Sequence, residues 1–479
     1  VLGAECERLS WIVETGLIYG QPQAQAFERA LPACEAAASA DPERAKPHVL
    51  RSRILWNWAD YRVSQGQPTR EQSAQAIVAA RQAVALDARD PDTLANLGLA
   101  LWTRGEEVVG TGDPRPDLRE AAAALERAAA LRPNFVKTFS NLCGVYHELA
   151  DWQGLHGQDA DADLARAEDY GRRATELGGQ SWQVYNNLGL VYWTRAQTQL
   201  QRGRDPSATL EDARRTLARA LELNPKGPYA LRAMAGLEMV GARYELWRGG
   251  DPRPPLQRAR EHAQRAVEAK PDYANGFAAW GQVEGLQAEY LLDHGGDLGP
   301  SLAAGRQAFA RALAINADAT DAFLGTIRLE VAAARAAQIQ GASPRAHFDA
   351  ADRAARRLQA AAPADPDTSV ATALLHRWRA EWKLAQRQDA APDIERGLAA
   401  AEQALGINAR EAEGKALAAA LHLLAARQAR DEPTRLREAG RARALLQEAF
   451  ELNPLLRRPH EAVAQEAARL TAGMQAAAR

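Results

Sequence analysis

The apolar residues in the middle of the chain follow the spacing of two amphipathic helices. Phe139, Leu142 and Tyr146 recur at intervals of three and four residues, which places them on one helix face. The pattern predicts a helix from residue 136 to about residue 152. A turn rich in Gly and Asp follows, and small residues then mark the inner face of a second helix predicted over 164–177.

This pair of helices, here termed helix A and helix B, recurs along almost the whole chain with a period of 46 residues. The clearest landmark is the proline-bearing turn after helix B, as at Asn224-Pro225 and Asn453-Pro454. A period of this length is typical of solenoids rather than of globular enzyme cores, because each repeat buries its apolar face only against its neighbours. Equivalent turns are centred on residues 41, 87, 132, 178, 224, 270, 316, 362, 408 and 453.

Two ladders of equivalent residues support this register. The turn between A and B has a Gly-Asp-Pro signature, as at Gly112 to Pro114 and Gly250 to Pro252. We expect its Gly to end helix A, its Asp to cap helix B, and its Pro to occupy the first helical position. One site of helix B is small in all copies but Leu358, which predicts close approach of neighbouring helices. It is occupied by Ala37, Ala83, Ala128, Ala174, Ala220, Ala266, Ala312, Ala404 and Ala449.

The repeats resemble tetratricopeptide (TPR) repeats, whose usual unit has about 34 residues. The matching residues in the fourth and fifth copies are Asn141-Leu142-Cys143, Tyr146, Asn187-Leu188-Gly189 and Tyr192 in helix A, and in the helix B of the fifth copy they are Ala213, Leu217, Ala220 and Pro225. The chain departs from the family by about 12 extra residues between the matched parts of A and B, and the match weakens from Thr320 onward.

The period and the resemblance together predict an all-α fold, a right-handed superhelical α-solenoid of about ten TPR-like helix-turn-helix repeats. The repeats are expected over residues 1–456, and a C-terminal capping helix over 457–479. Val1 falls at about the third position of a helix A, so we expect a further region upstream.

Composition excludes several classes of function. The 479 residues carry 59 basic and 61 acidic side chains, a formal net charge of −2, so nothing indicates general affinity for nucleic acid or anionic membrane. No apolar run is long enough to span a membrane, and no signal peptide is visible. A cytoplasmic location is expected.

The cysteines Cys6, Cys34 and Cys143 are few and widely spaced, which predicts neither a disulfide framework nor a zinc site. Cys6 and Cys143 occupy the site held by Gly98, and Cys34 aligns with Leu125. Structural burial is therefore expected for all three, and a reactive thiol is the alternative.

No motif in the chain carries recognisable catalytic or cofactor chemistry. There is no phosphate loop with Lys, no His-Glu-x-x-His and no Cys-x-x-Cys. Asp159, Asp161 and Asp163 resemble the start of a calcium loop but lack its central Gly and distal Glu, so a helix cap in a solvated turn is the preferred interpretation. We expect no enzyme activity within this chain, no cofactor and no metal.

The candidate binding surface is the inner face of the A helices, which lines the concave groove in the family that the repeats resemble. One equivalent position there carries large side chains in five successive copies, and they could anchor an extended peptide or a helix. The alternative is that they pack between the lengthened A helices. The five residues are Trp56, Trp102, His147, Trp193 and Met239.

Asparagines form a second ladder beside this stripe, namely Asn96, Asn141 and Asn187. In peptide-binding members of the family, Asn at this site hydrogen-bonds the ligand, and Lys137 lies on the same side. Asp92 and Gln183 occupy the sites equivalent to Lys137, so a terminal-carboxylate clamp is disfavoured. Asn that is solvated or bridges two helices is the alternative.

The leading functional hypothesis is a non-catalytic scaffold that binds a protein or peptide partner. The long repeats resemble the arrays attached to large bacterial serine/threonine protein kinases, which implies a regulatory or substrate-recruiting region of a signalling protein. One alternative is a sensor array that closes its own groove over a linked effector domain. Another is a structural spacer in a homo-oligomer. Neither the partner nor the oligomeric state follows from the sequence.

Overall fold

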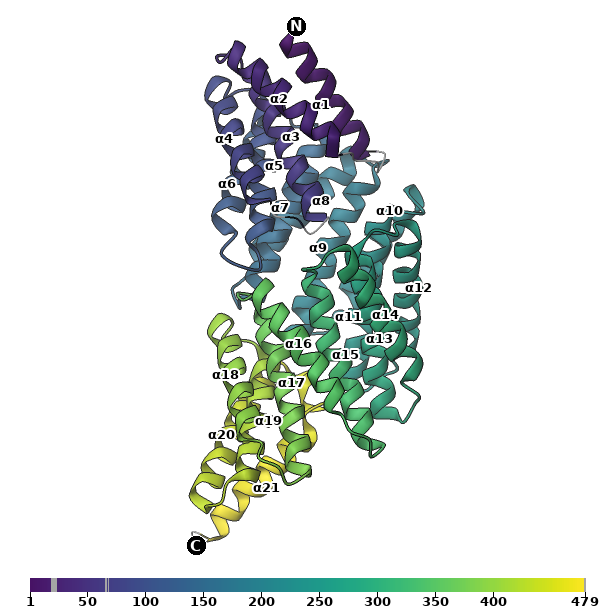
Figure 1. Ribbon diagram of the computed structural model, residues 1–479, viewed down its shortest axis with the longest axis vertical. Coiled ribbons are helices and arrows are strands. Elements are labelled where there is room, and N and C mark those ends of the chain that lie inside the picture. Colours follow the sequence, from purple (N-terminus) through teal and green to yellow (C-terminus); the bar gives the residue numbers. More distant parts are fainter. Residues whose placement is uncertain (19–23, 65–66, 68, 478–479) are drawn as a thin grey trace. The chain divides into compact units, whose positions relative to one another are not determined.

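The computed structural model describes residues 1–18, 24–64, 67 and 69–477, and in these it contains 21 α-helices, one short 3-10 helix and no strand (Figure 1). The A helices are α1 (Leu2–Ile18), α3 (Ala45–Ser64), α5 (Pro91–Val108), α7 (Val136–Leu155), α9 (Trp182–Gln201), α11 (Pro228–Arg248), α13 (Ala274–His294), α15 (Thr320–Ile339), α17 (Pro366–Ala385) and α19 (Ala412–Gln428). The B helices are α2 (Ala24–Ala40), α4 (Arg70–Leu86), α6 (Arg115–Leu131), α8 (Asp161–Leu177), α10 (Ser207–Leu223), α12 (Arg253–Ala269), α14 (Gly299–Ile315), α16 (Arg345–Ala361), α18 (Ala391–Ile407) and α20 (Glu432–Leu452). The chain ends with the 3-10 helix η1 (Pro454–Arg457) and the helix α21 (Glu461–Ala477).

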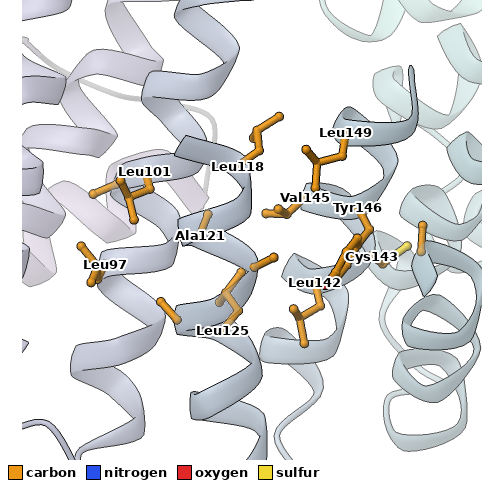
Figure 2. Packing of buried hydrophobic residues seen from close by; sticks show 14 of the residues in the cluster. Leu97, Leu101, Leu118, Ala121, Leu125, Leu142, Cys143, Val145, Tyr146 and Leu149 are labelled. Atoms are coloured by element: carbon orange, nitrogen blue, oxygen red, sulfur yellow. The ribbon is translucent and has the colours of Figure 1, made fainter. Parts of the chain in front are cut away.

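The predicted α-solenoid of ten A/B pairs and a final helix is confirmed. Contacts between helices are densest within pairs such as α5 with α6 and α11 with α12, and each pair then packs on the next. In Figure 2 the leucines of α5, α6 and α7 meet in one continuous core, where Leu101, Leu118 and Leu125 are fully buried. Helix α7 is slightly longer than the sequence predicted, ending at Leu155 rather than near residue 152.

The alanine ladder of the B helices is buried along its whole length, as the repeat register predicts. Ala83, Ala128 and Ala220 are completely inaccessible, and Leu358, the one large residue in the ladder, is buried as well. A side chain larger than Ala at most copies would push neighbouring helices apart, since interiors are packed without spare volume.

The turns between A and B end and begin helices largely as expected. Gly203, Gly249, Gly295 and Gly341 take positive φ at the ends of A helices. The carboxylate of Asp251 accepts a hydrogen bond of 3.0 Å from the backbone N–H of Arg253 and so caps α12. The prolines differ slightly from the prediction: Pro252 is the last residue before α12 rather than its first residue. Pro fits there because its fixed φ already lies close to the helical value.

The helices divide into two compact units, which are described separately. Unit 1 contains residues 1–152 and 160–191, and unit 2 contains residues 153–159 and 192–479. Two of the three boundaries fall within α7 and α9 and the third in the turn before α8, so the division follows contacts in space rather than a linker in the sequence.

Unit 2 closes on itself through contacts between turns that lie far apart in the sequence. The side-chain amide of Asn408 donates to the carbonyl oxygen of Leu155 at 3.0 Å, and that of Asn453 donates to the carbonyl oxygen of Leu200, also at 3.0 Å. Both pairs are 253 residues apart, which equals five and a half repeats of 46 residues. We call this pair of hydrogen bonds the closing contact.

Glycines allow this close approach. Gly203 has φ +66, and a Cβ atom built there would lie 2.5 Å from Cδ of Pro454. A Cβ atom at Gly157, with φ +68, would lie 2.2 Å from Oδ1 of Asn408. These two glycines therefore end their A helices and leave room for the turns that contain Asn408 and Pro454.

The cysteine prediction is wrong for one pair. Cys6 of α1 and Cys34 of α2 form a disulfide across the first repeat, with their Cα atoms 4.7 Å apart. The reason lies in the repeat register, since the equivalent residues Gly98 and Leu125 are also in contact. Cys143 is a free, buried thiol, as expected, and burial raises its pKa to about 12.

Candidate functional site: the inner face of the A helices

The tryptophans of the predicted stripe in unit 1 lie between consecutive A helices. The indole N–H of Trp56 on α3 donates to the side-chain oxygen of Asn96 on α5, at 3.0 Å. The ring of Trp102 on α5 lies against Gly144 of α7, where a Cβ atom would be only 2.3 Å from the ring. Both rings are partly buried against the core. Their contacts are those of the alternative interpretation, packing between long A helices.

The remaining stripe residues have mixed surroundings. His147 on α7 is half-buried, with Nδ1 3.8 Å from the carboxylate of Glu148. The ring of Trp193 on α9 lies against Gly236 of α11, but Trp193 and Met239 also line a cavity in unit 2. Trp56, Trp102 and His147 belong to unit 1, and Trp193 and Met239 belong to unit 2.

The asparagine ladder bridges helices in at least two of its three members. Asn96 is buried and accepts from Trp56, whereas its own amide nitrogen has no partner in the described part of the chain. The amide of Asn187 donates to the hydroxyl of Ser140 on the preceding A helix, at 3.1 Å. Asn141 is half-buried and Lys137 is exposed.

Two neighbouring cavities occupy the interior of unit 2. The first cavity has a volume of about 310 Å³ and is lined from α9, α11, α13 and α15, by the N-terminal ends of α17 and α19, and by the closing contact. The second cavity has a volume of about 460 Å³ and is lined from α11, α13, α15, α17, α19 and α21. They share the wall residues Arg243, Trp247, Glu289, Arg328, Glu413 and Leu456.

Charged side chains of both signs face these cavities. Four carboxylates surround Arg328, and its Nε atom is buried without a hydrogen-bond partner among the described residues. Burial and the nearby carboxylates Asp367 and Glu413 raise the pKa of Glu411 to about 7. Burial also raises the pKa of Asp367, against the opposing effect of Arg328. The lining of the first cavity therefore holds buried ionisable groups of both signs close enough to shift one another's pKa.

The charges are balanced in number. The first cavity is lined by four arginines and four carboxylates, and the second by five of each. A site built for a polyanion such as nucleic acid would carry a clear excess of basic groups. The balance instead suits a polypeptide segment that carries both signs of charge and apolar side chains.

Sequence reasoning missed these charged residues, although the repeat register points to them. The site of Lys137 continues through later copies as Asp321, Asp367 and Glu413. The stripe position continues beyond Met239 as Gly285, Val331, Arg377 and Leu423. Following both positions to the end of the chain would have identified the interior of unit 2.

Other chemistry is sparse. The carboxylate of Asp163 accepts two hydrogen bonds from the guanidinium of Arg119, at 2.7 and 3.1 Å, in keeping with a structural role near the start of α8. No group of ligands suited to a metal ion occurs in the described ranges. Of the helices described, none has the length and apolar content needed to cross a membrane.

Comparisons with known proteins show the fold. No protein-family model and no curated protein sequence match the chain. The human IFIT1 dimer with PPP-AAAA superimposes with a TM-score of 0.52 at 15% identity, covering 98% of this chain and 91% of that one. The human IFIT1 dimer with m7Gppp-AAAA gives 0.52 at 14% identity, covering 98% and 90%.

A smaller solved structure, the thermophilic TPR protein TTC0263 from Thermus thermophilus, is similar at 17% identity with a TM-score of 0.34. It covers 48% of this chain and 98% of its own. The successive A/B helix pairs and the likeness to the IFIT1 structures show that the chain has the fold of a TPR-like α-solenoid. At these identities the likeness extends to the fold alone.

Proposed function

We propose that this chain is a non-catalytic scaffold that binds a polypeptide partner in the interior of unit 2. The observation that carries the proposal is the pair of cavities lined by successive A helices, in which apolar walls alternate with charges of both signs. TPR-like folds commonly present such surfaces to extended peptides or helices, which supply apolar anchors and complementary charges.

Gly285 offers a way to test the site without disturbing the fold. It lies on α13 at the stripe position and lines the first cavity, and a Cβ atom there would meet no other atom within 4 Å. The Cβ atom of Gly285→Trp therefore meets no neighbour, and its indole should occupy part of the first cavity. Gly440 on α20 is the matched control, since a Cβ atom there also meets nothing within 4 Å, but it does not line either cavity.

The experiment selects random peptides displayed on phage against the purified chain and measures the affinity of the enriched peptides. We expect Gly285→Trp to weaken their binding by at least about tenfold, because the apolar anchor loses its space. Gly440→Trp should bind as the wild type does. Failure to enrich any peptide, or equal binding to both variants, would contradict the proposal.

RNA is the competing ligand, because the similar human IFIT1 structures contain PPP-AAAA and m7Gppp-AAAA. The equal numbers of arginines and carboxylates in both cavities argue against a triphosphate. The oligonucleotide PPP-AAAA, titrated in the same assay, tests this directly. Binding that Gly285→Trp abolishes would favour RNA over a polypeptide.

We further propose that the array belongs to a larger bacterial signalling protein, in which it recruits substrates to a serine/threonine kinase domain. The support is the resemblance of the long repeats to such arrays. The coding sequence upstream of Val1 tests it: a Gly-rich nucleotide loop followed by His-Arg-Asp is expected.

The self-regulating sensor is the second candidate, and the closing contact is the observation that favours it.

A further inference from the structure

Arg377 occupies a repeat position that otherwise carries no permanent charge. The equivalent residues on the other A helices are Ser10, three tryptophans, His147, Met239, Gly285, Val331 and Leu423. Packing between helices therefore needs no cation there. An arginine at this site must lose much of its hydration, so its presence calls for a compensating partner.

No side chain of the described chain compensates Arg377 closely. Its side chain is 15% exposed, and its nearest carboxylate, Glu381, lies 3.9 Å away, beyond hydrogen-bond distance. The Nε atom is buried and has no partner in the part of the chain described. The guanidinium instead stacks on Trp378, with Cζ 4.1 Å from the ring centroid.

The two arginines nearest in the second cavity are already paired. Nε of Arg427 donates to Glu466 at 2.6 Å, and Nη2 of Arg335 donates to Asp293 at 3.4 Å. Arg335 also stacks on Trp378, with Cζ 4.0 Å from the centroid. Of these three neighbouring guanidinium groups, that of Arg377 is the one whose donors are left available.

A second unpartnered group lies in the same cavity. His460 is only 8% exposed, and its Nδ1 atom has no hydrogen-bond partner in the described ranges. Burial and the charge of Arg377 lower its pKa to about 4, so the ring is neutral at pH 7 and can donate one hydrogen bond. The mixed wall of the cavity also includes apolar side chains, among them Leu374, Leu423 and Val463.

We propose that the second cavity of unit 2 binds a carboxylate on an apolar body, held by the guanidinium of Arg377 with His460 beside it. A guanidinium and a carboxylate form paired, charge-assisted hydrogen bonds, and the leucine-rich wall receives the apolar part. A single negative charge is favoured over the two of a phosphate, because Arg427 and Arg335 already donate to carboxylates and Arg377 is the one guanidinium of the three without such a hydrogen bond.

Burial, together with the charges of Arg335 and Arg427, lowers the pKa of Arg377 to about 10, in spite of Glu381. A bound anion would raise the pKa of Arg377 again, because it favours the charged guanidinium. The inference goes beyond the proposed function, because a small organic acid would satisfy the site as well as the end or an acidic side chain of a polypeptide.

Calorimetric titration of the full chain tests the site with three probes: phenylacetate, and the tetrapeptide Ala-Ala-Leu-Phe with a free or an amidated carboxyl terminus. We expect the free acid to bind at least about tenfold more tightly than the amide. Arg377→Met, which keeps the length of the side chain, should weaken binding by a similar factor. Arg353→Met on α16 is the control, since Arg353 is exposed and lines neither cavity.

Binding of the free peptide but not of phenylacetate indicates a polypeptide source, the reverse indicates a small acid, and both results support the site. Equal affinity for acid and amide, no binding of either acid, or unchanged affinity in Arg377→Met overturns it. If Arg377→Met fails to fold, Arg377→Gln takes its place. The peptides that test the proposed function are scored separately by Gly285→Trp, so either proposal can fail alone.

Discussion

At the scale of single residues, buried carboxylates join neighbouring helices of unit 2. Glu238 on α11 has a side chain 1% exposed and accepts from Arg214 of α10 at 2.7 Å and from Arg258 of α12 at 2.8 Å. Glu284 and Glu330 occupy the same position in the next two repeats and bind Arg260 and Arg306. Burial would raise the pKa of Glu238, but the two arginines lower it overall.

Glu238→Gln removes the charge while keeping the shape. We expect unfolding to become easier by about 2 kcal/mol, less than for a fully buried pair, because the arginines can turn to water. A carboxyl group whose pKa is lower in the folded chain stabilises the fold at pH values above its pKa in the unfolded chain. This stabilisation is lost as the pH falls through the folded pKa. The difference in unfolding free energy between the wild type and Glu238→Gln should therefore narrow below about pH 4. Urea midpoints at several pH values measure it.

The control for this substitution is Glu222→Gln. Glu222 pairs with Arg219 on the surface of α10, with 64% of its side chain exposed. Exposed pairs contribute little, so the change should stay below about 0.5 kcal/mol. Equal effects of the two substitutions would show that the buried carboxylate of Glu238 stabilises the fold no more than an exposed ion pair does.

At the scale of helices, the sequence was sufficient to predict almost every element. The 46-residue period located the ten A/B pairs, because apolar spacing and turn residues recur in each copy. It did not reveal the disulfide, since odd and sparse cysteines in general argue against one. The alignment of Cys6 with Gly98 and of Cys34 with Leu125 contained the missing information, because equivalent residues contact in equivalent pairs.

The disulfide should stabilise the first repeat and little else. It joins residues 28 apart, and closing a loop of that size contributes about 3.5 kcal/mol. Since the first repeat packs mainly on α3 of the second, reduction should accelerate hydrogen exchange in α1 and α2 and leave α5 and α6 unchanged. Exchange measured by mass spectrometry with and without reductant tests this. Uniform acceleration along the chain, or none in α1, would contradict it.

At the scale of the whole chain, two features lay outside the reach of sequence reasoning. Two of the three boundaries between the units fall inside helices, where no change in composition marks them. The closing contact depends on small rotations that accumulate over five and a half repeats, and the sequence of one repeat does not fix their sum. The tryptophan stripe was predictable as a ladder, but its contacts with Gly144 and Gly236 depend on how closely the A helices approach.

The closing contact makes a prediction about unit 2. Asn408 and Asn453 are both buried, and each satisfies the carbonyl oxygen of a distant turn. The double substitution Asn408→Ala and Asn453→Ala removes both side-chain donors, at a cost of about 1 kcal/mol each, since the carbonyl oxygen of Leu200 still accepts from the backbone N–H of Gly203 at 3.0 Å. We expect the turn to open in a measurable fraction of molecules. Spin labels at Arg204 and Arg457, exposed residues on its two sides, would then report a second, longer distance.

Asn316→Ala provides the matched control for the opening of unit 2. Asn316 occupies the same turn position in an earlier repeat, and its side chain accepts only a local hydrogen bond, from Asp318 N–H at 3.0 Å. It should leave the label distance unchanged. If the double variant also keeps a single short distance, the remaining contacts hold the turn closed. The sensor hypothesis would then lack the conformational change that it requires. If the double variant opens and a selected peptide restores the short distance, peptide binding and closure are coupled. A ligand can shift a conformational equilibrium only if it binds one of the two states more tightly than the other.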